Sequence, residues 1–326
     1  MFSQNSWFHW IGRVDSDGGS KSLRWHQVIE QTTAQTDIAL LGFNSDLGVA
    51  VNKGRVGSKD GPNAIRSSLC SLAWHLEQSI KDLGNVEAKT NLAAAQHKYA
   101  QQINGALNSS GFVIGLGGGH EIALASYTGL RNYLQAKNKR KIGIINFDAH
   151  FDLRIPAPDP SSGTPFYQIA DTCHQHAEAF HYICLGVAKA ANTQVLFDCA
   201  NSLQVEYLLD EDCQQHADIA RAKEMIMPML NAVDEVYLTV CLDAFPAALA
   251  PGVSAPSALG IPVTFVISIM RWLSAQQADL NFNWRLMDIA ELNPKFDMDS
   301  RTAKLAARIL FESVHAKAQG DDLTNV

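Results

Sequence analysis

The sequence predicts a three-layer α/β/α protein with a mostly parallel central sheet. Short, β-rich apolar runs recur along the chain, and most of them are separated by segments with helical character. The runs are apolar throughout, as expected for strands whose two faces are both covered by helices in a parallel sheet. No internal repeat, low-complexity tract or linker marks a boundary, so residues 1–326 are predicted to form one domain, with residues 1–35 as an N-terminal extension packed on it.

The predicted elements follow in chain order. The strands are Ile38 to Phe43, Phe112 to Gly117, Lys141 to Asp148, Phe180 to Val187, Val205 to Leu209, Glu235 to Ala244, and Trp284 to Leu292. Gly61 and Pro62 open a helix that runs towards Ile80, because proline is favoured in the first helical turn. Near the end, Ser300 is expected to cap a helix whose apolar side chains share a face: Leu305, Ala306, Ile309, Leu310 and Val314.

The composition argues against several classes of partner. A net charge of -7 without any Lys/Arg block disfavours nucleic acid and anionic membranes, and favours a small-molecule substrate. The longest apolar stretch, around Ala258 to Met270, contains Gly260 and Pro262 and is shorter than the roughly 20 residues of a membrane helix. Met1 to Trp10 has no basic region followed by a long apolar run, so we expect no secretory signal there. Six irregularly spaced cysteines fit reduced thiols in a cytoplasm better than a disulfide framework.

The densest polar signal, Asn146 to Asp152, follows directly after an apolar strand. If extended geometry continues, Asp148, His150 and Asp152 lie on one side of the strand at its carboxyl end, where open parallel sheets bind ligands. Two carboxylates and an imidazole that converge there would repel and desolvate one another unless a cation lies among them. The alternative interpretation is an exposed polar turn with a capping aspartate.

Two other strand ends carry residues of the same kind. The strand Phe112 to Gly117 leads into glycines whose lack of side chains lets the backbone approach a ligand and project His120. A dinucleotide fingerprint is disfavoured, because His120 occupies the position of its last glycine. A later strand ends at Asp243, with Cys241 two positions earlier on the same face. Without the other motifs, Cys241 would be interpreted as a small buried hydrophobe.

Together these strand ends supply five candidate metal ligands: His120, Asp148, His150, Asp152 and Asp243. Oxygen and imidazole donors suit Mn²⁺, and they also accept Fe, Co or Zn. Shared carboxylates can hold two ions about 3.5 to 4 Å apart, which lower the pKa of water so that it becomes a nucleophile at neutral pH. The sequence therefore predicts a metal-dependent hydrolase.

Four motifs resemble those of the ureohydrolase family, to which arginase and agmatinase belong: GGGH at 117–120, DAHFD at 148–152, LDAFPAALAPGVSAP at 242–256 and ELNP at 291–294. The resemblance implies the arginase-like fold, a homo-oligomer, and metal ligation by the five residues above. This chain departs from the family pattern at Cys241, where the family has an aspartate that bridges both metals. Two Mn²⁺ ions are therefore expected, with Cys241 either as a ligand or as the cause of a weakened second site.

The resemblance also assigns the catalytic residues. Glu291 matches the acidic residue that faces the amidine or guanidine of the substrate, and its alternative is a simple strand-end carboxylate. Asp152 is expected to stabilise the tetrahedral intermediate. Phe166 stands at the position of the family's proton shuttle, so the leaving nitrogen must gain its proton from another group or from water.

Arg154 stands where arginase-type sequences carry an asparagine. Its planar fork suits a carboxylate, and SSGTPF at 161–166 resembles the formimidoylglutamase branch of the family. The predicted activity is hydrolysis of N-formimidoyl-L-glutamate, which carries two carboxylates, in histidine degradation. Alternatives are an Arg154 ion pair with Asp159, a guanidino acid substrate such as 4-guanidinobutanoate, and a metal-poor, non-catalytic relative. The other expected substrate-binding residues are Ser162, Thr164, Asn52 and Arg55.

Overall fold

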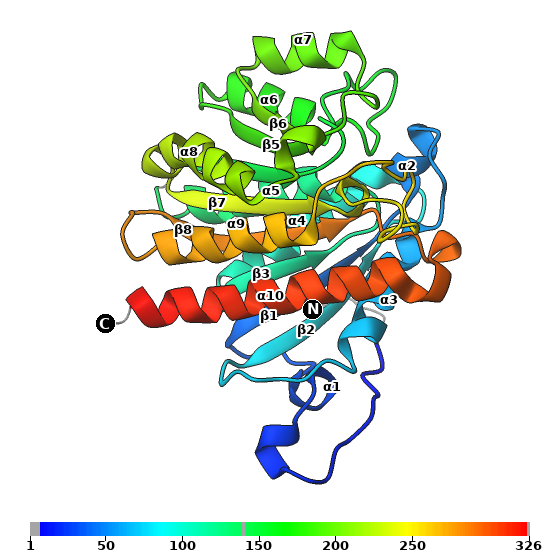
Figure 1. Ribbon diagram of the computed structural model, residues 1–326, viewed down its shortest axis with the longest axis vertical. Helices are drawn as coiled ribbons and strands as arrows, with labels where there is room; N and C mark the ends of the chain where they lie inside the picture. Colours follow the sequence, from blue (N-terminus) through cyan, green and yellow to red (C-terminus); the bar gives the residue numbers. More distant parts are fainter. Residues whose placement is uncertain (1–6, 139–140, 325–326) are drawn as a thin grey trace.

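The computed structural model describes residues 7–138 and 141–324, and the strands of these residues form one parallel sheet (Figure 1). The sheet has eight strands in the order β2-β1-β3-β8-β7-β4-β5-β6. Their bounds are β1 (Thr36–Asn44), β2 (Ile80–Glu87), β3 (Ser110–Leu116), β4 (Ile142–Phe147), β5 (His181–Val187), β6 (Glu206–Leu209), β7 (Glu235–Cys241) and β8 (Asn283–Ala290).

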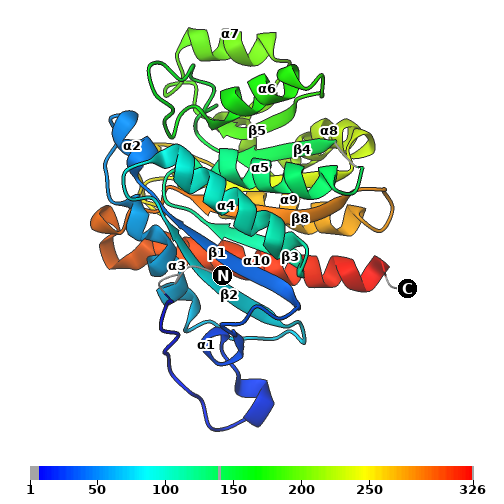
Figure 2. The same ribbon diagram turned by 180° about the vertical axis from the view of Figure 1, so that it is seen from behind.

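Helices cover both faces of the sheet. One layer, in front in Figure 1, contains α3 (Gly61–Leu69), α8 (His216–Ala232), α9 (Val263–Gln276) and α10 (Arg301–Thr324). The opposite layer, in front in Figure 2, contains α4 (Leu92–Leu107), α5 (Ile122–Gln135) and α6 (Pro165–Gln175), with α7 (Gln194–Ser202) beyond them. Each layer packs on its own apolar core, and the predicted α/β/α architecture is confirmed.

Short helices complete the chain. They are α1 (Trp25–Val28) and α2 (Leu47–Val51), and the 3-10 turns η1 (Gly19–Ser22), η2 (Ser58–Asp60), η3 (Asp210–Cys213), η4 (Leu242–Ala244), η5 (Pro294–Phe296) and η6 (Met298–Ser300). No helix within the described ranges is both long enough and apolar enough to cross a membrane.

The edge strand β2 was missed in the sequence, and the helix predicted to run towards Ile80 ends at Leu69 instead. The reason is that β2 carries polar residues that are nevertheless buried. Its Asp82 forms an ion pair with Arg66 of α3 at 2.7 Å, with both side chains fully buried. A strand that buries a paired charge shows no apolar run, so hydrophobicity alone does not reveal it.

The start of α10 also differs from its prediction. Asp297, rather than Ser300, caps the helix: its carboxylate accepts the backbone N–H groups of Thr302 at 2.8 Å and Ala303 at 2.9 Å. Ser300 has a φ of +54°. The predicted apolar face is present, with Leu305 partly buried and four residues fully buried: Ala306, Ile309, Leu310 and Val314.

The N-terminal segment packs against β2 at the edge of the sheet. Trp25 is fully buried and contacts Trp74 edge to face, with 5.1 Å between ring centroids. Trp10 donates its indole N–H to Asp82 at 2.9 Å. Trp10 and Trp25 both belong to the predicted N-terminal extension, residues 1–35. Residues 1–6 of that extension lie outside the described residues.

Candidate functional site

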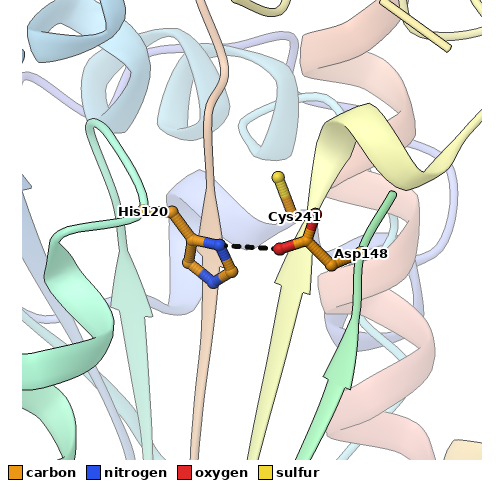
Figure 3. Close-up of side chains that lie close together, drawn as sticks. All are labelled: His120, Asp148 and Cys241. Carbon is orange, nitrogen blue, oxygen red and sulfur yellow. Dashed lines mark ion pairs between the residues drawn. The ribbon is translucent and has the colours of Figure 1, made fainter. Parts of the chain in front are cut away.

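Four neighbouring strands bring polar residues to one edge of the sheet. β3, β8, β7 and β4 are adjacent and parallel, so their carboxyl ends lie side by side. His120 follows β3, Cys241 ends β7 and Asp148 follows β4 (Figure 3). The Nδ1 atom of His120 lies 2.9 Å from Oδ2 of Asp148, with both side chains buried.

The predicted metal ligands form two overlapping groups. The potential ligand atoms of His120, Asp148 and Cys241 lie within 4.8 Å of one another, and so do those of Asp148, His150 and Asp243. Asp148 belongs to both groups. Asp152 completes the cluster, because its Oδ2 atom also lies 2.9 Å from Nδ1 of His120. Two groups that share one carboxylate are the arrangement expected of a two-metal site.

The geometry around His120 supports a cation in this cluster. Its buried Nδ1 atom faces two carboxylates, yet it has no hydrogen-bond partner among the described residues. A nitrogen lone pair and two carboxylates that point at one place have the donor chemistry of Mn²⁺, Fe²⁺ or Zn²⁺. The residues present therefore fit a metal ion.

Burial shifts the pKa values of the cluster. Burial alone would raise the pKa of Asp148, but interactions with His120 and His150 hold it below its usual range. Burial and the charge of Asp148 raise the pKa of Asp152 to about 6. Burial, together with the surrounding carboxylates, raises the pKa of Cys241 well above that of an ordinary thiol. The Cys241 thiol donates to Asp243 at 2.9 Å.

The loop that carries Asp148 is not extended. β4 ends at Phe147, and Asp152 has a φ of +49°. Asn192 holds the loop: its amide donates to the Ala149 carbonyl at 2.8 Å, and its oxygen accepts the Phe151 N–H at 3.2 Å. The predicted convergence is present, but the extended geometry from which it was inferred is wrong.

The third strand shows the same difference. β7 ends at Cys241, two residues before Asp243, rather than continuing to Ala244 as predicted. Asp243 instead lies in the turn η4, where its Oδ2 atom lies 3.2 Å from Nδ1 of His150.

A cavity of about 290 Å³ opens from the ligand cluster. Three of the predicted substrate-binding residues line it: Asn52, Arg154 and Ser162. The Asn52 side-chain amide donates to the Ser162 hydroxyl at 3.3 Å, so these two lining residues are hydrogen-bonded to each other. Both Arg154 and Asp159 are exposed, and no ion pair joins them within the described chain, so that alternative for Arg154 is not what the structure contains.

Two other predicted substrate-binding residues are not brought to the cavity. The Arg55 guanidinium donates to the Ser254 carbonyl at 3.1 Å and lies 4.2 Å from the centre of the Phe296 ring. The Thr164 hydroxyl accepts the Ser161 N–H at 2.9 Å and donates within its own turn. Both side chains hold loops in place here, because their polar groups bind other groups of the chain, and their role as substrate contacts stays a prediction.

Glu291 is a buried residue of the cavity lining. One carboxylate oxygen accepts the backbone N–H of His120 at 2.9 Å, while the other is buried without a hydrogen-bond partner among the described residues. Burial, then the charge of Asp243, raises the pKa of Glu291 well above its usual range. Glu291 also has a φ of +73°, a strained conformation of the kind that gathers at functional sites. A buried carboxylate in this position suits a cationic amidine.

Phe166 lies under the cluster rather than in the cavity. Its ring is fully buried, contacts the His120 imidazole edge to face at 5.4 Å and stacks on Tyr182 at 4.4 Å. It therefore packs the metal-facing imidazole from below.

Sequence reasoning missed other residues of this site. Lys53 lines the cavity and has a φ of +60°, and Asn192 lines it while holding the ligand loop. Lys53 directly follows the predicted residue Asn52, which was the signal available for it, whereas Asn192 lies far from the motifs and gives no signal of its own in one sequence.

The sequence matches a known protein family and several named relatives. The model of the arginase family matches residues 36–315. The formimidoylglutamase of Hahella chejuensis is 42% identical over 303 residues, or 92% of each chain. That of Ralstonia nicotianae is 43% identical over 316 residues, or 95% of each chain.

Solved structures share the fold. Formimidoylglutamase from Bacillus subtilis matches with a TM-score of 0.78 at 19% identity, over 94% of this chain and 96% of that one. Trypanosoma cruzi formiminoglutamase, solved with Mn²⁺, matches with a TM-score of 0.73 at 21% identity, over 86% and 93% of the two chains. The family resemblance inferred from the motifs is confirmed, and the chain belongs to the arginase family.

Proposed function

We propose that this chain is a metal-dependent hydrolase that converts N-formimidoyl-L-glutamate to L-glutamate and formamide. The observation that carries the proposal is the polarity of the cavity. Its lining contains the buried carboxylate of Glu291, one oxygen of which has no hydrogen-bond partner in the described part of the chain, and the exposed Arg154. A substrate with a cationic amidine at one end and carboxylates at the other is complementary to both. Relatives that are more than 40% identical and bear the name formimidoylglutamase support this choice.

The metal centre is assigned to the two overlapping groups. His120, Asp148, Asp152 and Cys241 would hold one ion, and Asp148, His150 and Asp243 would hold the other. We expect Mn²⁺, because most donors are oxygen and imidazole and because a formiminoglutamase of this fold was solved with that ion. When bound, the ions would lower the pKa of water and so supply a nucleophile at neutral pH.

The protein's own residues orient the substrate. Glu291 accepts hydrogen bonds from the amidinium, and Arg154 pairs with a carboxylate of the glutamate moiety. Lys53 lines the same cavity and supplies a second cation for the second carboxylate, while Asn52 and Ser162 offer hydrogen bonds. Held in this way, the formimidoyl carbon is presented for attack without a search through other orientations.

The proposed reaction is hydrolysis of a carbon–nitrogen bond of the formimidoyl group. The oxygen of water bonds to the formimidoyl carbon, the bond from that carbon to the glutamate nitrogen breaks, and formamide leaves with the new oxygen. Asp152 is proposed to stabilise the tetrahedral intermediate. Because the phenyl ring of Phe166 cannot transfer a proton, the proton that the glutamate nitrogen gains comes from another group or from water.

Hydrolysis in ¹⁸O-labelled water tests this assignment. Mn²⁺-loaded protein should place the label in formamide and leave the released glutamate unlabelled. Protein stripped of metal is the control. Release of ammonia with labelled N-formylglutamate would show that the other carbon–nitrogen bond is cleaved, and it would contradict the proposed orientation of the amidine.

Two further assignments are proposals from the sequence and the family. We infer that the chain forms a homo-oligomer and acts in the cytoplasm, where its six cysteines stay reduced. Size-exclusion chromatography with light scattering measures the first, and a monomeric mass at micromolar concentration would contradict it.

A further inference from the structure

A chain of hydrogen bonds lies behind the metal-facing side of His120. The Nε2 atom of His120 is 3.0 Å from the Thr239 hydroxyl oxygen, and that hydroxyl donates to Oδ1 of Asp288 at 2.5 Å. Thr239 lies on β7 and Asp288 on β8, and the two residues are direct partners across the parallel pair. All three side chains are buried.

The hydrogen atoms in this chain can be placed by elimination. A threonine hydroxyl has one hydrogen, and here it points to Asp288. The Thr239 oxygen can then only accept from His120, so Nε2 of His120 carries the N–H. In a neutral imidazole the other nitrogen is then a bare lone pair. That nitrogen is Nδ1, the atom that faces Asp148 and Asp152.

The other contacts of Asp288 keep it an acceptor of the Thr239 hydroxyl hydrogen. Its second oxygen accepts the hydroxyls of Ser126 and Tyr237, each at 2.6 Å. Burial raises the pKa of Asp288, and the three hydroxyl donors oppose that rise. A fully satisfied buried network of this kind is rigid, and it leaves the carboxylate as an acceptor on both oxygens.

We propose that Thr239 and Asp288 are positioning residues that fix the tautomer of His120 and aim its Nδ1 lone pair at the metal centre. This inference rests on the metal-dependent function proposed above, but not on the identity of the substrate. Residues that hydrogen-bond to the far nitrogen of a metal-bound histidine act in this way in general, and their loss weakens metal binding about 10- to 100-fold. Here the carboxylate acts through an intervening hydroxyl.

The test separates the Thr239 hydroxyl from the shape of its side chain. Thr239→Val keeps the branched shape and loses the hydroxyl, whereas Thr239→Ser keeps the hydroxyl and loses a methyl group. Calorimetric titration of metal-free protein with Mn²⁺ should show binding weakened about 10- to 100-fold in Thr239→Val and close to wild type in Thr239→Ser. Thr36→Val, which removes another buried threonine hydroxyl far from the cluster, should leave Mn²⁺ affinity unchanged.

A second variant keeps the test decisive. If Thr239→Val does not fold, Asp288→Asn takes its place, since the amide disturbs the same chain of hydrogen bonds at its far end. Wild-type Mn²⁺ affinity in a folded Thr239→Val or Asp288→Asn protein would overturn the proposal, and so would equal losses in Thr239→Val and Thr239→Ser. Because the readout is metal binding, a wrong substrate assignment would leave this result intact.

Discussion

His120 and Asp152 face each other across the candidate metal centre, with 2.9 Å between Nδ1 and Oδ2. The Oδ2 atom of Asp148 also lies 2.9 Å from the same nitrogen of His120. An imidazole and two carboxylates, of which that of Asp148 is fully buried, are held here by the segments that follow β3 and β4, so their convergence is built into the fold. Without a cation, this arrangement places like charges together in a region of low dielectric.

Metal removal should therefore destabilise the protein. An ion that binds only the folded state stabilises it by about 2.7 kcal/mol at a free concentration 100 times its dissociation constant. We expect the thermal unfolding midpoint to fall on chelation and to rise again with added Mn²⁺, in step with activity. A midpoint that does not respond to Mn²⁺ would contradict the metal assignment.

Substituting Asp148 should remove both ions, because its carboxylate belongs to both ligand groups. Asp148→Asn is expected to lose bound metal and all activity, and His150→Ala should lose activity through the second group. Metal content per chain, measured by elemental analysis, checks this. Asp279→Asn, at an exposed position after α9, is the control and should keep both metal and activity.

Cys241 offers a test of the unusual ligand. A thiolate is softer than a carboxylate, and the raised pKa of Cys241 means that a proton must be removed before it can bind a metal. Cys241→Asp should therefore bind Mn²⁺ more tightly than wild type, and Cys241→Ala should bind fewer ions per chain. If Cys241→Ala retained two tightly bound ions, the thiol would not be a ligand.

Arg154→Ala should mainly weaken substrate binding. If the bound substrate shields the pair of Arg154 with its carboxylate from water, loss of the guanidinium weakens binding by roughly 2 to 5 kcal/mol, seen as a higher KM. Arg154→Lys should recover part of the effect, since it keeps the charge but not the planar fork. Arg221→Ala, whose side chain pairs with Asp212 away from the cavity, is the matched control. Unchanged KM and kcat in Arg154→Ala would remove the basis of the substrate assignment.

Thr164 should behave as a structural residue. Its hydroxyl satisfies groups of its own turn, so Thr164→Val should lower the free energy of unfolding by about 1 to 3 kcal/mol, because it leaves the buried Ser161 N–H unpaired. KM should change little. Urea unfolding and steady-state kinetics measure the two effects, and a large rise in KM at wild-type stability would return Thr164 to the substrate site.

Much of the fold was predictable because its strands are buried on both faces. Their apolar runs and the motifs at their ends identify both the sheet and the edge where the site lies. β2 could not be found in this way, because Asp82 is buried through its ion pair with Arg66, a partner that the sequence does not indicate. Pairing of this kind depends on the tertiary structure.

The candidate site was predictable in its residue types but not in its local geometry. The strand period placed Asp148, His150 and Asp152 together, yet the chain reaches that result through a loop held by Asn192. Arg55 was predicted to contact the substrate, but its guanidinium binds backbone carbonyl groups in this structure. Its carbonyl partners belong to a segment distant in sequence, which only the folded chain brings near.

Product release by Mn²⁺-loaded protein from N-formimidoyl-L-glutamate, measured beside arginine, agmatine and 4-guanidinobutanoate, tests the proposed function most directly. We expect formamide and glutamate from the first compound and no reaction with the other three. Urea from a guanidino compound, with none of the predicted products, would keep the fold and the metal centre but contradict the role given to Arg154. Inactivity on all four by protein that holds its metal would contradict the proposed function itself.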